Sequence, residues 1–386
     1  METIRKDLKA FQWTDWLVMV MTTGVFLPHT VCMAVLLGCC IFAAVKGGIK
    51  MLVEKSWEYY CLYAFLLLEV IVCTFYKNWD GLLIIIGFVG VFLYTGFYRK
   101  TAHKKLLIYL IEWALILSLL TAVLGLIQFN HVSQLGGYSF WDFEIQNSPK
   151  RRITGTFQNA NIYAMILELV LICSFYRFLC IKNWSRRFYY MFVAGVQFFM
   201  ILLTGCRAAL VPIVFIIPLM LAMHKKKRML MVYCGLFTIA VIAVFIKPDL
   251  IPRIDDISTI QSRVKIWKCA VEGIKEYPLF GNGPWTYHRI YPQFHGHKAV
   301  HSHNIYLDCV LSFGIIGCTL LAGYVIGLLK DVWSTYKKDR LLFSLMGACF
   351  LVIGIHGLVD GTIYPIKVML LFMMIVNLRL KPQETV

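Results

Sequence analysis

Long apolar runs are the feature that most constrains the fold of this 386-residue chain. Twelve such runs, each roughly 20 residues long, are expected at 14–27, 29–46, 57–76, 80–98, 105–128, 158–181, 187–204, 207–223, 229–247, 303–329, 341–358 and 361–379. A membrane-spanning helix needs about 20 mostly apolar residues. The chain is 59% apolar and 15% charged, whereas soluble domains average about 45–50% apolar and about 25% charged. The sequence therefore predicts an all-α, polytopic integral membrane protein with about 12 transmembrane helices.

Basic residues are distributed unevenly between these runs. If the N-terminus is cytoplasmic, the cytoplasmic segments contain 24 of the 38 Lys and Arg residues, and the short outer turns contain almost none. Cytoplasmic loops of membrane proteins are enriched in Lys and Arg. The pattern predicts that both termini are cytoplasmic, and it explains the net charge of +17 without a nucleic-acid partner.

The remaining cations lie mostly in two long segments on the opposite side. We expect an N-terminal transmembrane bundle of about five spans at 1–128, a first extracytoplasmic loop at 129–157, and central spans at 158–247. A long extracytoplasmic catalytic loop at 248–302 and C-terminal spans with a short cytoplasmic tail at 303–386 follow. In the second loop, apolar residues recur at 260, 264, 267, 271 and 274. This three-four spacing predicts an amphipathic helix near the outer membrane surface.

Arginines on the predicted outer side are candidates for anion binding. They are Arg151 and Arg152, Arg207 in the segment Leu-Thr-Gly-Cys-Arg, and Arg263 in the long loop. An arginine is permanently charged and can bind two phosphate oxygens at once. Arg207 alone could be an interfacial anchor, but three arginine sites facing one compartment favour an anion site.

Four of the ten histidines fall within nine residues, at His295, His297, His301 and His303. Their spacing matches no standard zinc motif, so we expect no metal and no other cofactor. An imidazole titrates near neutral pH and is a suitable general base outside the membrane. Asp360, at a predicted outer turn, is placed to orient an arginine or a histidine.

Two alternatives stay open at this point. Glu69, Glu112 and Glu168 lie within apolar spans, where carboxylates are costly and often functional. They could serve a twelve-span secondary transporter. The histidines at 295–303 could instead serve a metal transporter.

Several short motifs together resemble those of bacterial O-antigen ligases and O-antigen polymerases. In chain order they are Arg152-Ile-Thr-Gly-Thr-Phe with Asn161, Leu203-Thr-Gly-Cys-Arg207, Ser262-Arg263 with Trp267, Pro278-Leu-Phe-Gly-Asn-Gly, His301-Ser-His-Asn-Ile-Tyr-Leu with Gly314-Ile-Ile-Gly317, and His356-Gly-Leu-Val-Asp360. The set covers roughly residues 150–365 and includes the long loop before the final spans. Two positions depart from the family pattern: Ser312 stands where the family often has Glu, with Asp308 one helical turn before it, and Cys206 replaces the more usual Ser.

The resemblance implies an inverting, metal-independent membrane glycosyltransferase. Its donor would be a glycan on undecaprenyl diphosphate, its acceptor a glycan or a lipid-linked glycan, and its active site would face outward from the bacterial inner (cytoplasmic) membrane, among membrane lipids. By position, Arg207 and Arg263 match the family's diphosphate-binding arginines, and His303 matches its catalytic histidine. Around these catalytic residues we expect a substrate-binding set of Arg151, Arg152, Asn161, His301, Asn304 and Asp360.

Overall fold

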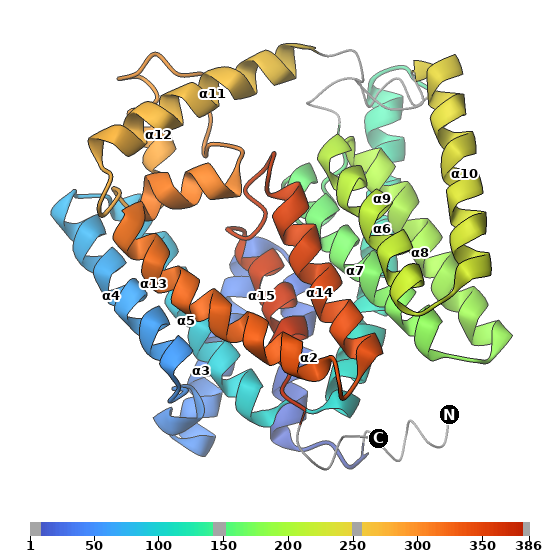
Figure 1. The fold of residues 1–386 in the computed structure, drawn as a ribbon, viewed down its shortest axis with the longest axis horizontal. Coiled ribbons are helices and arrows are strands. Elements are labelled where there is room, and N and C mark those ends of the chain that lie inside the picture. Colours follow the sequence, from blue (N-terminus) through green and yellow to red (C-terminus); the bar gives the residue numbers. More distant parts are fainter. Residues whose placement is uncertain (1–8, 142–151, 249–256, 381–386) are drawn as a thin grey trace.

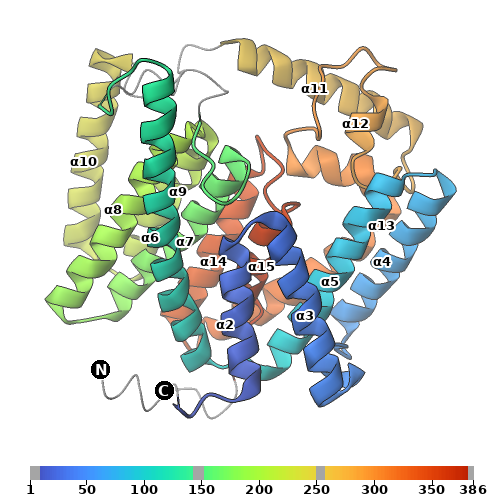
Figure 2. The same cartoon turned by 180° about the vertical axis from the view of Figure 1, so that it is seen from behind.

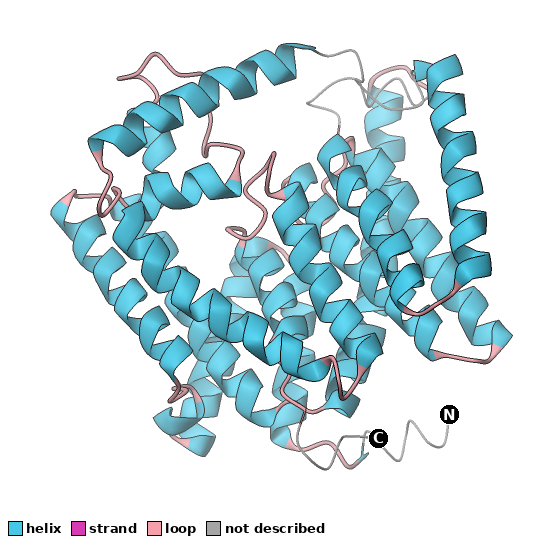
Figure 3. Ribbon diagram, in the orientation of Figure 1, coloured by secondary structure: helices cyan, strands magenta, loops and turns pink. Residues whose placement is uncertain are grey.

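The computed structural model describes residues 9–141, 152–248 and 257–380, and within these ranges it contains helices and no strand (Figure 3). The helices are α2 (Trp13–Phe26), α3 (His29–Gly47), η1 (Ile49–Met51), α4 (Trp57–Phe75), α5 (Trp79–Thr101), α6 (Lys104–Leu135), α7 (Ala160–Cys180), α8 (Trp184–Thr204), η4 (Arg207–Ala209), α9 (Leu210–Met223), α10 (Lys227–Ile246), α11 (Ile257–Glu276), α12 (Thr286–Ile290), α13 (Ile305–Thr335), α14 (Arg340–His356) and α15 (Ile366–Val376).

Each of the twelve predicted apolar runs coincides with a helix. Eight helices in the described ranges are long and apolar enough to cross a membrane: α3, α4, α5, α6, α7, α8, α10 and α13. The other four, α2, α9, α14 and α15, are shorter. The all-helical membrane class is confirmed, whereas the number of spans and the sidedness of the long loop stay predictions.

Helix α7 lies at the centre of the bundle and is the most buried of the long apolar helices. It packs against α8, α14 and α15. Helices α11 and α12 lie at one end of the molecule, opposite the turns that join α7 to α8 and α13 to α14 (Figures 1 and 2). The first turn of α7, the last turn of α8 and the first turn of α13 meet at the end occupied by α11 and α12, so segments far apart in the chain converge there.

Helix α13 is bent rather than continuous, a feature that the sequence pattern did not predict. Gly314 has φ +59° and ψ −174°, which interrupts the helix. The freed backbone groups bind the turn at 278–283: Ile315 N–H donates to the Pro278 carbonyl (2.9 Å), and the Ser312 carbonyl accepts from Gly283 N–H (2.8 Å). A Cβ at position 314 would collide with the Leu279 backbone, so both the dihedral angles and the close approach require glycine.

The amphipathic helix predicted in the long loop is present as α11, and part of the predicted stripe packs on the protein, since Trp267 and Ile274 contact the buried cluster. Ile266, Cys269 and Ala270 are buried against α12 and α13. Ile260 and Val264, which belong to the predicted apolar stripe, are exposed. The packed face of α11 thus lies beside the predicted stripe and shares Trp267 and Ile274 with it.

Candidate active site

A cavity of about 1230 Å³ opens between the first turn of α7, the segment after α8, α11 and the loop that follows α14. Seven of the predicted site residues line it: Arg152, Asn161, Arg207, Arg263, His301, His303 and Asp360. These residues come from five separate segments of the chain. The structure therefore brings most of the predicted site together in one space.

Local backbone features place these side chains. Asn159 caps α7 by accepting the Asn161 backbone N–H (2.8 Å), so Asn161 stands in the first turn of that helix. Gly205 adopts a left-handed conformation (φ +61°) that ends α8. Arg207 follows two residues later, at the start of η4, and lines the cavity.

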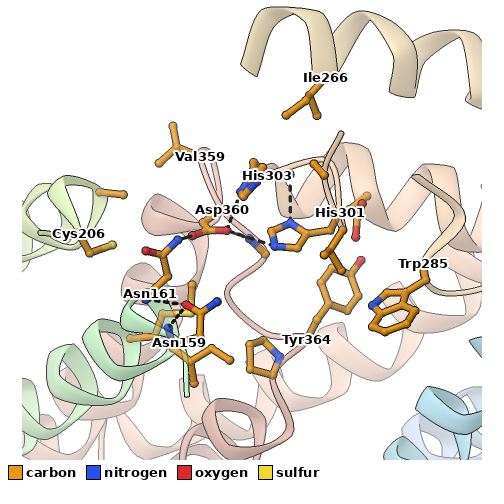
Figure 4. A pocket seen from close by; sticks show the side chains of 18 of the residues that line it. Asn159, Asn161, Cys206, Ile266, Trp285, His301, His303, Val359, Asp360 and Tyr364 are labelled. Carbon is orange, nitrogen blue, oxygen red and sulfur yellow. Dashed lines mark hydrogen bonds and ion pairs between the residues drawn. The ribbon is translucent and has the colours of Figure 1, made fainter. Parts of the chain in front are cut away.

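Asp360 is the centre of the site, as Figure 4 shows. Its Oδ1 lies 3.1 Å from His303 Nδ1 and 3.6 Å from His301 Nε2. The carboxylate is 3% exposed, whereas each histidine side chain is 29% exposed. A buried carboxylate thus contacts two imidazoles that still face the cavity.

The same carboxylate is linked to an arginine. Asn161 Nδ2 donates to Asp360 Oδ2 (2.6 Å), and the Asn161 Oδ1 accepts from Arg152. Arg152 also donates to the carbonyl of Thr204, the last residue of α8. A hydrogen-bonded chain therefore runs from Arg152 through Asn161 and Asp360 to His303.

The hydrogen bonds define which nitrogen of each imidazole can take a proton. A carboxylate only accepts, so the neutral form of His303 donates from Nδ1 to Asp360 and keeps its Nε2 lone pair. His301 Nδ1 accepts the His303 backbone N–H (3.1 Å), which leaves His301 Nε2 as the N–H that faces Asp360. His303 Nε2 is the nitrogen that can accept a proton from an acceptor hydroxyl.

The charged groups shift one another's pKa values. Burial raises the pKa of Asp360, but the hydrogen bond from His303 and the charges of His301, His303 and His356 outweigh it, so that the pKa lies well below its usual value. Burial lowers the pKa of His301; His303 and Arg263 lower it further, and Asp360 and Asp308 oppose this shift. Asp360 is therefore charged and His301 neutral at pH 7.

Burial lowers the pKa of Arg152 as well, and Cys206 and Asp360 oppose this shift, while the charge of Arg207 adds to it. An arginine remains protonated despite such a shift, because its usual pKa is above 12. The electrostatic effects of Arg207 on Arg152 and of Arg263 on His301 place several cations around one cavity. This arrangement can bind an anion with more than one negative charge.

The two other predicted site residues are Arg151 and Asn304. Arg151 lies outside the described residues. Asn304 caps α13, because its side-chain oxygen accepts from Tyr306 N and Leu307 N (both 3.0 Å) and its amide donates to the Leu358 carbonyl. In this structure Asn304 fixes the helix that follows His303.

The three membrane-embedded glutamates have separate surroundings. Glu112 pairs with Arg177 (2.6 Å), Glu168 pairs with His356 (2.7 Å), and Glu69 is buried beside Gly317. None of the three is among the residues that line the cavity. Their positions form no shared pathway through the site.

Sequence reasoning missed the pair beneath Arg207. His356 binds Glu168 through Nδ1, and its Nε2 lies 3.9 Å from the Sγ of Cys206. Both members of the pair are fully buried. His356 had been noted only within its motif, and Glu168 only as a transport candidate; nothing in their spacing of 188 residues could have paired them.

Asp308 and Ser312, the two residues of the first half of α13 noted in the sequence, both line the cavity. Asp308 Oδ1 accepts the backbone N–H of Ser302 (2.9 Å), next to His303. The carboxylate that contacts His303 itself is Asp360. Asp360 thus supplies the carboxylate that contacts His303, whereas Ser312 stands where the family often has Glu.

His301, His303 and Asp360 also form the one group in the described residues with donor atoms close enough for a metal ion, within 4.8 Å of one another. Two imidazoles and a carboxylate are suitable zinc ligands. However, His303 Nδ1 and Asp360 Oδ1 already bind each other, and arginines line the same cavity. The donor set is therefore engaged internally, in a positively charged space.

Comparison with known protein families gives a match. No curated protein matches the chain. Residues 191–322 match the family model described as O-antigen ligase, a range that includes Arg207, Arg263 and His303. Together with the long apolar helices, this match is consistent with a bacterial membrane protein. Residues 191–322 of the chain are therefore similar to the O-antigen ligase family, in agreement with the resemblance of its motifs.

Proposed function

We propose that the protein is an inverting, metal-independent glycosyltransferase that moves a glycan from undecaprenyl diphosphate to an acceptor hydroxyl. The observation that carries the proposal is the hydrogen-bonded chain Arg152–Asn161–Asp360–His303 in a cavity that Arg207 and Arg263 also line. It joins anion-binding groups to a histidine with a free ring nitrogen. These are the two components that transfer from a glycosyl diphosphate requires.

The arginines and His303 would carry out different parts of the transfer reaction. A glycosyl diphosphate is already activated, so the protein must stabilise the leaving diphosphate and remove the proton of the attacking hydroxyl. The guanidinium groups of Arg207 and Arg263 bind the diphosphate oxygens as negative charge develops on them. His303 Nε2 accepts the proton while Asp360 stabilises the imidazolium that forms.

The stereochemical outcome follows from a single displacement. The hydroxyl attacks the anomeric carbon from the side opposite the diphosphate and inverts that centre. A retaining mechanism would need a carboxylate nucleophile beside the sugar. Asp360 is 3% exposed and bound to His303 and Asn161, which makes it a poor nucleophile.

The site lies on the extracytoplasmic side in this proposal, with the carrier lipid in the outer leaflet. The test is to reconstitute the purified protein in liposomes with an undecaprenyl-diphosphate-linked oligosaccharide and an acceptor glycan. Transfer should proceed without nucleotide, divalent metal or ion gradient. If transfer required a gradient, the transporter alternative would gain support instead.

A further inference from the structure

Two cysteines of α13 lie on opposite sides of its bend. Cys309 precedes Gly314 and Cys318 follows it, and their Sγ atoms are 3.4 Å apart. In a continuous α-helix, residues nine positions apart are separated by roughly 13 Å along the axis. The interruption at Gly314 therefore brings the two thiols together.

The two sulfur atoms are in non-bonded contact at 3.4 Å. A disulfide needs an S–S distance of about 2.0 Å, so side-chain rotations with a small backbone shift can close the gap. Both cysteines are partly exposed, unlike most of the other cysteines in the chain, which are buried. The protein itself therefore does not enclose this pair completely.

We propose that Cys309 and Cys318 are a disulfide-forming pair that locks the bend of α13 beside the active site. The inference rests on the extracytoplasmic placement proposed above, because disulfides form and persist in oxidising compartments. The oxidant is a low-molecular-weight or protein disulfide. One cysteine thiolate attacks it and releases one thiol, and the second cysteine attacks the mixed disulfide and releases the other. Two thiols are oxidised, one disulfide is reduced to two thiols, and the two cysteine protons pass to the released thiolates.

The bend that this disulfide would lock shapes the cavity. The first half of α13 begins directly after His303 and Asn304, and it carries Asp308 and Ser312 into the cavity wall. The Ser312 carbonyl also binds the turn at 282–283. Straightening α13 would break these contacts, so the disulfide would hold the site in the arrangement seen here.

The bond can be read by mass alone. Cleavage after Lys298 and Lys330 gives the peptide 299–330, which contains Cys309 and Cys318 and no other cysteine. The full-length purified protein is treated with oxidised glutathione or with a reductant, alkylated with iodoacetamide and digested with trypsin. In the oxidised arm the peptide should be unalkylated and lighter than the dithiol peptide by two hydrogen atoms; in the reduced arm it should carry two alkyl groups.

Two results would overturn the proposal. One is a doubly alkylated peptide in both arms, and the other is a stable glutathione adduct on one cysteine, since a reachable partner would displace it. The Cys309→Ser variant is the matched control and should retain glutathione on Cys318. The melting temperature should rise on oxidation of the wild type and stay unchanged in Cys309→Ser. Because the mass readout needs no substrate, it holds whether or not the protein transfers glycans.

Discussion

Replacing Asp360 with asparagine tests the proposed role of the carboxylate beside His303. The substitution keeps the size of the side chain and removes its charge. The new amide can present its oxygen to His303 Nδ1 and to the Gly361 N–H, both of which bind Oδ1 in the wild type. Its NH₂ group then faces the Nδ2 of Asn161, and Asn161 cannot turn around because its own oxygen accepts from Arg152. Two donors oppose each other where a hydrogen bond of 2.6 Å stood.

The expected effect on the rate follows from the lost charge. At 3.1 Å, a carboxylate and an imidazolium attract each other by about 5 kcal/mol at an effective dielectric constant of about 20. This figure is an upper bound, because the His303 side chain is 29% exposed and water screens the pair. With about 1.4 kcal/mol for each factor of ten, we expect Asp360→Asn to lower kcat by about 10² to 10⁴.

The assay is transfer of the carrier-linked oligosaccharide to an acceptor, with donor binding and thermal unfolding measured in parallel. Donor affinity should stay near that of the wild type, because Arg207 and Arg263 are unchanged. Asp308→Asn is the matched control: its carboxylate accepts the Ser302 N–H, a bond that asparagine can keep, so kcat should change by no more than about threefold. The reasoning would be refuted by an Asp360→Asn enzyme with near-normal kcat, or by an equal loss in both variants.

Other residues give further predictions. Arg207→Lys and Arg263→Lys should each weaken donor binding and transfer although the charge is kept, because lysine cannot bind a diphosphate bidentately; full activity in both would remove the diphosphate role. His303→Ala should lower the transfer rate by about 10² to 10⁴ while donor binding persists. His295→Ala, at an exposed position away from the cavity wall, should have a mild effect. A larger loss of rate in His295→Ala than in His303→Ala would show that another histidine is the base. Chelation should leave transfer intact, whereas activity lost to a chelator and restored by zinc would favour a metal role for the histidines. The pKa of His301 is lowered in the folded state, so the unfolded chain binds more protons than the folded chain below about pH 6.5. The melting temperature should therefore fall when the pH is lowered from 7.5 to 5.5, and it should fall less in the His301→Gln variant. An equal fall in the wild type and the variant would contradict the assignment.

The helices were predictable because each apolar run is long and strongly patterned. That Arg207, Arg263 and His303 lie in one cavity was also predictable, since all three belong to motifs of one predicted site. The hydrogen-bond partners of these residues could not be predicted. Asn161 and Asp360 are 199 residues apart, and a hydrogen bond between them depends on how the start of α7 meets the loop after α14, which no local spacing describes.

The bend of α13 was missed for a related reason. The run at 303–329 is mostly apolar, and a glycine within such a run is tolerated by a helix at modest cost. The bend depends on another segment of the chain. The turn at 278–283 supplies hydrogen-bond donors and acceptors for the backbone groups of α13 that the interruption frees. Asn78 in turn binds the carbonyls of Asn282 and Pro284, so a residue before α5 helps to hold the bend.

The balance of charge in the cavity explains why Asp360 is buried and doubly bound. Arg152, Arg207 and Arg263 line the same cavity as His301 and His303, and these cations would repel a developing imidazolium. The charged carboxylate of Asp360 offsets this repulsion at the ring of His303. Asn161 binds one of its oxygens and His303 binds the other. The diphosphate of the donor would neutralise the arginines on the other side. In the proposed mechanism the proton would therefore move to His303 most easily once the donor is bound, so the action of the base would depend on the presence of the leaving group.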